Sequence, residues 1–159
     1  MSKNQKLGNI EVMTSFCNIS TVQDGRGAIF TFFPNQPIVE FNMLYFLPNK
    51  IRGNHFHPEF EEYFLIVSGS VVMVTKDPET GKEINMHASS GTCFRTPPNT
   101  AHAVHAITNA VCISLLTKKW DDCNPPILYE DLIDFDPNYQ KYIKKEEVKK
   151  NNKNKKKNK

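Results

Sequence analysis

Residues 52–69 read RGNHFHPEFEEYFLIVSG, and most of what the sequence says about fold and function follows from this stretch. Side chains two residues apart on a β-strand point to the same face, so His55 and His57 are predicted to project together. Glu62 opens the run EYFLI, whose alternate members are Phe and Ile, so this face is predicted to point inward. An inward carboxylate needs a partner, because burying an unpaired charge is costly. Glu61 has the opposite parity and is predicted to face solvent.

Short runs rich in β-branched and aromatic residues fill the middle of the chain, separated by turn signals such as DGRG, PNQP and PPNT. The runs that predict strands cover residues 28–33, 39–47, 63–69, 70–76 and 110–116. A DPETGK turn after the fourth run predicts a hairpin. No helical crossover separates these runs, which favours an all-β sandwich or barrel. One short C-terminal helix is predicted over residues 136–148, with Asp136 as N-cap and Pro137 at the first helical position.

The charge of the chain is unevenly distributed. Lysine and arginine total 20 against 17 acidic residues, a net charge of +3, but residues 144–159 hold nine lysines and two glutamates and so carry +7. Residues 1–143 therefore carry −4. The Lys/Asn-rich tail has too few apolar residues to offset ordering entropy and is predicted to be disordered, while residues 8–143 are the predicted folded domain. No aromatic residue interleaves with these lysines as base stacking would require, so we expect no specific nucleic-acid partner.

The sequence also bears on the compartment of the protein. No stretch has the length of a signal-peptide apolar region or of a membrane span. The four cysteines are scattered without CxxC spacing, and in the absence of a secretory signal they are expected to be reduced. We therefore expect a cytoplasmic protein that has no membrane partner.

A second histidine pair lies in the segment GTCFRTPPNTAHAVHAI, residues 91–107. His102 in this segment joins the two histidines and the glutamate of the first stretch in a donor set suited to Zn²⁺, Fe²⁺, Mn²⁺ or Ni²⁺. The predicted ligands of a divalent transition metal are His55, His57, Glu62 and His102, and no organic cofactor is expected. The residues alone leave three interpretations open: a metal site, a set of acid–base groups, or histidines that fill a core.

The spacing of these residues resembles both signature motifs of the cupin superfamily. The first is His-x-His-x4-Glu-x6-Gly, from His55 to Gly69, and the second is Gly-x5-Pro-x-Asn-x2-His, from Gly91 to His102. Asn99 stands where the second motif usually has glycine, a mild departure because asparagine tolerates left-handed backbone angles. The resemblance implies a double-stranded β-helix, the jelly roll or cupin barrel, with its site inside the barrel.

Closer resemblances point to enzymes that act on sugar nucleotides. DGRGAIFTFF at residues 24–33, followed by RGNHFH at 52–57, resembles the pattern of dTDP-4-dehydrorhamnose 3,5-epimerases, which implies a catalytic base at His55. The dTDP-4-oxo-6-deoxyhexose 3,4-ketoisomerases have a similar histidine pair and a later His-x-x-His, which resembles His102 and His105. The opening stretch is also similar to the metal-binding cupin domain at the C-terminus of capsule-polysaccharide reductases. The three relatives share a reaction type and a substrate class but differ in their use of metal.

These resemblances imply a common chemistry and a role for each polar residue. A C–H bond beside a 4-keto group is broken, an enolate forms, and a proton returns at the other face or at the neighbouring carbon. Histidine suits the base because its pKa lies near neutrality, and arginine suits a diphosphate because its fork grips two oxygens. The predicted catalytic residues are His55, His102 and Tyr63. Tyr45 is the alternative proton donor to Tyr63. The predicted substrate-binding residues are Arg52, Arg26 and His105.

The sequence therefore predicts an epimerase or ketoisomerase that acts on a nucleotide-linked 4-keto deoxy sugar in polysaccharide or glycan precursor synthesis. Family resemblance also implies a homodimer, in which the segment before residue 30 pairs with a partner subunit. Two other functions remain open. One is a non-catalytic cupin that binds a metal or a sugar, and the other is an Fe²⁺-dependent dioxygenase, which the same donor set would serve.

Overall fold

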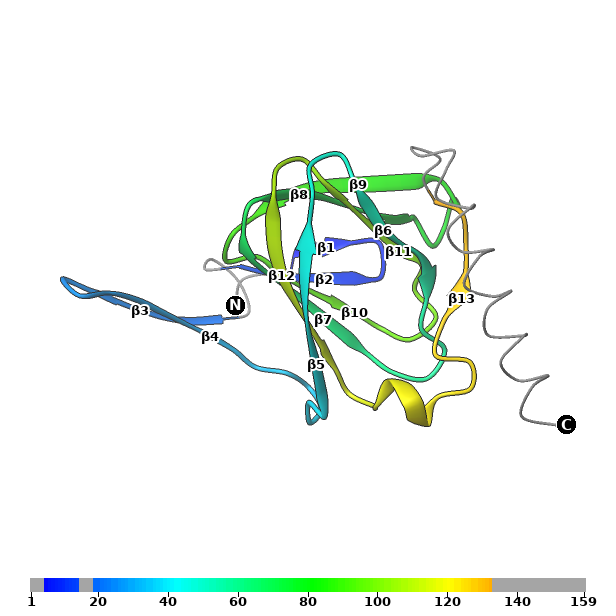
Figure 1. The fold of residues 1–159 in the computed structure, drawn as a ribbon, viewed down its shortest axis with the longest axis horizontal. Coiled ribbons are helices and arrows are strands. Elements are labelled where there is room, and N and C mark those ends of the chain that lie inside the picture. Colours follow the sequence, from blue (N-terminus) through cyan, green and yellow to red (C-terminus); the bar gives the residue numbers. More distant parts are fainter. Residues whose placement is uncertain (1–4, 15–18, 133–159) are drawn as a thin grey trace, which may run out of the picture.

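Figure 1 shows the fold in a computed structural model, which describes residues 5–14 and 19–132. One sheet contains, in spatial order, β1 (Gln5–Leu7), β2 (Ile10–Met13), β10 (Cys93–Thr96), β7 (Glu62–Ser68), β12 (Ala110–Leu116) and β5 (Glu40–Phe46). The facing sheet contains β13 (Leu128–Tyr129), β6 (Ile51–Phe56), β11 (His102–Ala106), β8 (Ser70–Lys76) and β9 (Glu83–Ser89). A separate hairpin consists of β3 (Ile19–Asp24) and β4 (Gly27–Phe32). A 3-10 turn, η1 (Trp120–Asp122), follows β12.

The two sheets pack face to face around one apolar core. The core takes Ile10 and Ile66 from the first sheet and Met73 and Val104 from the second, all of them buried. Strand pairing within both sheets is antiparallel. The β3–β4 hairpin extends away from this barrel (Figure 1). The predicted all-β jelly roll is confirmed.

All five predicted strands are present, and residues 110–116 form β12 with both ends as predicted. The DPETGK segment closes the antiparallel β8–β9 hairpin. The sequence analysis missed β1, β2, β3, β10 and β13, and all of these except β3 are four residues long or shorter. β1 precedes the predicted domain start at residue 8. The predicted helix over 136–148 and the predicted tail over 144–159 lie outside the described residues. Within the described ranges, no helix has the length and apolar character needed to cross a membrane.

The predicted solvent exposure of Glu61 is wrong. This residue is only 7% exposed, and its carboxylate accepts hydrogen bonds from Arg95 Nε at 3.1 Å and Nη2 at 2.7 Å. The outer face of the sheet beside it is covered by the segment that follows β4. In this segment the Asn35 backbone N–H donates to the Tyr63 hydroxyl at 2.8 Å, and Ile38 packs against the same face. Strand parity placed Glu61 on the outer face, but a second layer of chain keeps water from it.

Candidate functional site

A cavity of about 1020 Å³ lies between the two sheets of the barrel and is open to solvent on one side, where the exposed Tyr45 and Leu47 line it. Residues of β5, β6 and β12 line it, together with the segment that follows β12. Ligand pockets in proteins commonly have volumes of about 300–1,000 Å³, so this cavity can take a substrate of considerable size. The polar residues that line it include Glu40, Lys50, Arg52, His55, His57 and Glu62.

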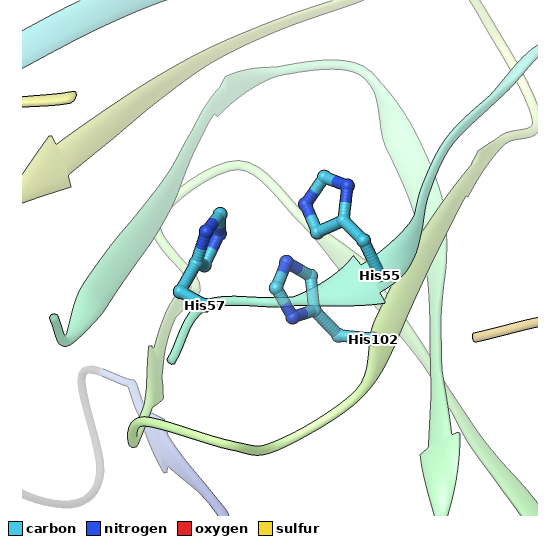
Figure 2. A group of neighbouring side chains, drawn as sticks. All are labelled: His55, His57 and His102. Carbon is cyan, nitrogen blue, oxygen red and sulfur yellow. The ribbon is translucent and has the colours of Figure 1, made fainter. Parts of the chain in front are cut away.

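Three histidines lie close together, as Figure 2 shows, and two of them, His55 and His57, line the cavity. His55 lies on β6, His57 directly follows that strand, and His102 begins β11 and pairs with His55 across the two strands. One ring nitrogen from each histidine lies within 4.8 Å of those from the other two. The chain turns into β11 through Asn99, whose backbone N–H donates to the His57 carbonyl at 2.8 Å. Asn99 has a φ of 58°, a left-handed backbone angle that asparagine tolerates.

Glu62 faces the histidine cluster from the opposite sheet, as its parity predicts. Its Oε2 atom lies 3.3 Å from His57 Nε2 and 3.0 Å from His102 Nε2. Its Oε1 atom accepts a hydrogen bond from the Ser114 hydroxyl. Burial raises the pKa of Glu62, but the contacts with His102 and His57 outweigh burial and hold the pKa well below its usual range. Burial lowers the pKa of His102, but contact with the Glu62 carboxylate outweighs it and raises that pKa.

The second ring nitrogens of two histidines define their tautomers. His57 Nδ1 lies 3.1 Å from the Pro126 carbonyl oxygen, and His102 Nδ1 lies 3.1 Å from the Thr100 carbonyl oxygen. A carbonyl only accepts hydrogen bonds, so both Nδ1 atoms carry a proton, and in a neutral ring Nε2 then presents a lone pair. Two such lone pairs facing the Glu62 carboxylate would repel it. A proton on each Nε2 atom removes this repulsion, and so does a metal ion bound among them.

The donor set fits a divalent transition metal. Metal-bound histidines usually donate their other ring N–H to a carbonyl or carboxylate, which is the arrangement of His57 and His102 here. Neutral imidazoles and one carboxylate are also the ligands that Zn²⁺, Fe²⁺, Mn²⁺ and Ni²⁺ accept. The residues that would hold the ion are His55, His57, His102 and Glu62.

His55 differs from the other two histidines. It is only partly buried, and among the described residues no hydrogen bond to its ring nitrogens is found. Burial, and then the neighbouring His102 and His57 rings, lower the pKa of His55 to about 3. The ring is therefore neutral at neutral pH and can bind a metal ion or accept a proton, but a pKa of about 3 makes it a weaker base than the near-neutral histidine that the sequence analysis expects.

A β-bulge turns Arg52 toward the same cavity. Across the β6–β11 pair, His102 lies opposite His55, and Val104 lies opposite Arg52. One residue separates His102 from Val104 but two separate Arg52 from His55, so β6 contains one extra residue, Asn54. Because of this extra residue, Arg52 and His55 share the inward face of the strand.

Gly53 makes the bulge sterically feasible. Its φ of +99° lies in the region that favours glycine, and a Cβ atom there would lie 2.6 Å from the His102 carbonyl oxygen. The bulge leaves the Arg52 guanidinium carbon 5.6 Å from the centre of the Phe46 ring, a cation–π contact on the cavity wall. The sequence analysis named Arg52 from its resemblance to other enzymes, and the bulge is the physical reason that it reaches the cavity.

Three predicted site residues lie away from this cavity within the described chain. Tyr63 points to the outer face of β7, where the segment after β4 covers it. Arg26 sits in the turn of the β3–β4 hairpin, ion-paired with Asp24 at 2.7 Å. His105 is three residues from His102 on β11, so its side chain points to the opposite face. Strand alternation explains why the Tyr63 and His105 side chains point away from the cavity. Arg26 is distant because its hairpin extends away from the barrel.

Tyr45, the alternative proton donor, does line the cavity, although 68% of it is exposed. The lining residues that the sequence analysis missed include Lys50, Ser114 and Trp120. Ser114 had a detectable signal, because it is the one hydroxyl residue in the apolar run AVCISLL and shares its parity with Cys112. Lys50 and Trp120 lie beyond the strand ends, where alternation gives no indication of direction.

Comparison with known proteins gives one family match and a likeness in fold to several solved structures of sugar-nucleotide enzymes. The family model described as "Polysaccharide biosynthesis C-terminal domain" matches residues 22–124. No curated protein matches the sequence. The solved structures that it resembles include dTDP-4-dehydrorhamnose 3,5-epimerases and 3,4-ketoisomerases.

Three of these structures illustrate the range. The dTDP-6-deoxy-D-glucose-3,5-epimerase RmlC of Legionella pneumophila, in complex with dTDP-4-keto-L-rhamnose, has a TM-score of 0.62 and 16% identity over 79% of this chain and 74% of that one. The TDP-quinovose 3,4-ketoisomerase WlaRB of Campylobacter jejuni has a TM-score of 0.64 and 16% identity over 78% and 95%. CapF, in complex with 3-isopropenyl-tropolone, has a TM-score of 0.54 and 21% identity over 71% and 34%.

At these identities the solved structures establish the fold, and they include members of all three groups that the sequence motifs resemble, so that resemblance is confirmed. The match to residues 22–124 covers more than half of the 159 residues. The chain therefore belongs to the polysaccharide biosynthesis C-terminal domain family.

Proposed function

We propose that this chain is an epimerase or ketoisomerase that moves a proton beside the 4-keto group of a nucleotide-linked deoxy sugar. The observation that carries the proposal is that Arg52 lines the same cavity as His55 and His57 of the histidine cluster. The substrate class draws support from the relatives. RmlC was solved with dTDP-4-keto-L-rhamnose, and WlaRB is a TDP-quinovose 3,4-ketoisomerase.

Arg52 is the residue that we assign to the diphosphate of the substrate. A guanidinium presents two parallel N–H donors to a pair of phosphate oxygens, which matches the chemistry of a sugar nucleotide. Arg52 and His55 lie opposite residues that are two apart on β11, a separation of roughly 7 Å along the strand. A diphosphate at Arg52 therefore leaves the attached hexose beside the histidines.

His55 is the residue that we assign to proton removal. It is neutral at neutral pH, and it is the least buried of the three histidines. It takes a proton from C3 or C5 of the sugar, the two carbons beside a C4 ketone, and the electrons of that C–H bond form the enolate. Return of a proton to the other face inverts the carbon, and return to the neighbouring carbon moves the ketone. Tyr45 lines the cavity and is the hydroxyl that we assign to returning the proton.

A divalent transition metal is part of this proposal. Held by the histidines and Glu62, it would stabilise the negative charge that develops on the enolate oxygen. His55 is both a candidate ligand and the candidate base, and the metal content of a His55→Asn variant separates these roles. Loss of the metal identifies a ligand, whereas retained metal with lost activity identifies the base.

The experiment that tests the function is incorporation of solvent deuterium. The full chain is incubated in D₂O with dTDP-4-keto-6-deoxyglucose, and the sugar is followed by proton NMR. We expect the C3 or C5 proton signal to disappear at a rate that increases with protein concentration. Loss of the C3 signal alone indicates a ketoisomerase, and loss of both signals indicates a 3,5-epimerase.

The same experiment is repeated with UDP-linked 4-keto sugars, because the nucleotide base is not assigned. Protein that binds these sugar nucleotides without exchanging any proton would contradict the proposal and favour a non-catalytic sugar-binding cupin. Bound iron, oxygen consumption and no exchange would favour the dioxygenase.

A further inference from the structure

Trp120 lies in the wall of the cavity beside the histidine cluster. It begins η1, the 3-10 turn that follows β12, and its side chain is among those that line the cavity. Its ring meets the His57 ring edge to face, with ring centres 6.1 Å apart and planes at 72°. His57 follows the end of β6 and Arg52 lies near its beginning, so Trp120 is at the histidine end of the cavity.

The structure holds Trp120 firmly in this position. Its ring packs against a small buried cluster formed by Phe60, Leu116 and Cys123. Its backbone N–H donates to Glu40 Oε2 at 2.8 Å, and its carbonyl accepts from the Cys123 N–H at 3.2 Å. The residue nevertheless remains only partly buried, so part of its ring is open to the cavity.

The exposed part of Trp120 combines an apolar surface with a hydrogen-bond donor. Among the described residues, no acceptor for the indole N–H is found within hydrogen-bonding distance. Tyrosine and tryptophan side chains in such positions usually find a polar partner, which a bound ligand can provide. A hexose has both complements, a face of C–H groups that packs on an aromatic ring and oxygens that accept hydrogen bonds.

We propose that Trp120 binds the hexose of the sugar nucleotide and holds it against the histidine cluster. This inference rests on the proposed function, because it takes the diphosphate to lie at Arg52. With the diphosphate there, the part of the substrate that reaches Trp120 is the sugar. Trp120 therefore contributes to recognition of the sugar and not of the nucleotide.

The chain contains a single tryptophan, so its intrinsic fluorescence reports on this position alone. The full-length protein is titrated with dTDP-glucose and UDP-N-acetylglucosamine, and separately with dTDP and UDP, while tryptophan emission is recorded. Calorimetry measures the same four dissociation constants independently. We expect at least one of the two sugar nucleotides to change the emission with a midpoint equal to its calorimetric Kd. The corresponding nucleoside diphosphate should bind with a much smaller change.

Two variants complete the test. Trp120→Ala should weaken binding of the sugar nucleotide about thirtyfold, because it removes the aromatic surface, while leaving dTDP or UDP binding unchanged. Trp120→Phe keeps the packing against Phe60 and loses only the indole N–H, so it should weaken binding about fivefold. Trp120→Phe also carries the test if Trp120→Ala fails to fold.

The outcomes separate this inference from the function on which it rests. If a sugar nucleotide binds without changing the emission, and both variants bind it as the wild type does, the role of Trp120 is overturned and the function stands. If Trp120→Ala weakens dTDP and dTDP-glucose equally, Trp120 contacts the nucleotide and the inference is overturned. If none of the four compounds binds the wild type, the proposed function and this inference are both overturned.

Discussion

Arg52 and His55 project into the same cavity although they are three residues apart on one strand. Three residues along a regular strand would place the two side chains on opposite faces. The extra residue at Asn54 restores a common face, and Gly53 makes the bulge possible through its positive φ and its close approach to β11. The position of Arg52, the candidate diphosphate-binding residue, relative to His55, the candidate base, thus depends on a single glycine.

Gly53→Ala should therefore be strongly destabilising. Its Cβ would lie 2.6 Å from the His102 carbonyl oxygen and 2.8 Å from the Ala103 Cα atom, in a backbone conformation with φ +99°. We expect a loss of about 3 kcal/mol in the free energy of unfolding from clash and backbone strain together. Urea unfolding of the purified variant measures it.

Gly91→Ala is the matched control for this change. Gly91 has a similar φ of +86°, but a Cβ atom there would have no neighbour within 4 Å. It should lose only about 1 kcal/mol, the cost of the left-handed conformation. Equal losses at the two positions would show that the close approach of β6 to β11 contributes nothing.

Strand alternation explains how much of the site could be predicted from the sequence. The inward direction of His55, His57 and Glu62 followed from parity within short strands, and parity was sufficient there. For Tyr63 the same rule indicates the outer face, and the structure places its side chain there. The inward direction of Arg52 depends on the β-bulge in β6, and a single sequence does not reveal a bulge.

The direction and burial of side chains outside regular strands were harder still to predict from the sequence. Trp120 lies in a turn whose direction depends on contacts with Phe60 and Glu40, both distant in sequence. Burial of Glu61 depends on the segment after β4 crossing the outer face of the sheet, a tertiary contact that no local pattern reports. The fold class, in contrast, follows from the many short strands and turns alone.

Ser114 is expected to position Glu62. Its hydroxyl donates to Glu62 Oε1 and leaves Oε2 facing His57 and His102. Ser114→Ala should weaken binding of Zn²⁺ about tenfold to a hundredfold, the usual effect of removing a group that orients a metal ligand. Competition with a chromophoric chelator measures this affinity without any activity assay.

Ser114→Thr retains the hydroxyl and should bind Zn²⁺ much as the wild type does. Ser90→Ala removes a comparable hydrogen bond, to the Val67 carbonyl at an exposed position, and serves as the control. Unchanged Zn²⁺ affinity in Ser114→Ala would mean that Glu62 keeps its orientation without the hydrogen bond from the Ser114 hydroxyl.

The titration of His55 predicts an acid-sensitive stability in the metal-free protein. Its pKa is about 3 in the folded state and near 6.5 in the unfolded chain, so the unfolded state binds the proton more readily. The contribution of neutral His55 to the free energy of unfolding is therefore fully present above pH 6.5, and it is lost as the pH falls from 6.5 toward 3. At pH 4.5 the loss from this one group is of order 2 kcal/mol.

The measurement is urea unfolding at pH 7 and pH 4.5 in the presence of a chelator. His55→Asn should lose less stability between these two pH values than the wild type does, by about 2 kcal/mol. His87→Asn changes an exposed histidine on the outer face of β9 and should behave as the wild type. An identical pH dependence in His55→Asn and the wild type would refute this account of His55.

The outer surface of β5 predicts the homodimer that family resemblance implies. β5 is an edge strand, Phe41 and Met43 on its outward face are 70% and 55% exposed, and Leu47 just beyond its end is 66% exposed. A row of large apolar side chains on an unpaired edge is usual for a surface that a second chain covers. Sedimentation velocity of the wild type should therefore give a dimer.

The double variant Phe41→Ser and Leu47→Ser should shift this equilibrium toward monomer. Ile107→Ser removes an exposed apolar side chain from a turn between β11 and β12 and should leave the dimer intact. A wild type that sediments as a monomer at micromolar concentrations would be inconsistent with the homodimer.

The most direct test of the central claim compares deuterium incorporation in two histidine variants. Each variant is incubated in D₂O with a 4-keto sugar nucleotide whose protons the wild type exchanges, either dTDP-4-keto-6-deoxyglucose or a UDP-linked 4-keto sugar. We expect no deuterium in the sugar when the protein is His55→Asn. His87→Asn should exchange at the wild-type rate. Full exchange in a correctly folded His55→Asn protein would contradict the account, because His55 would then be neither the base nor a ligand that the reaction needs.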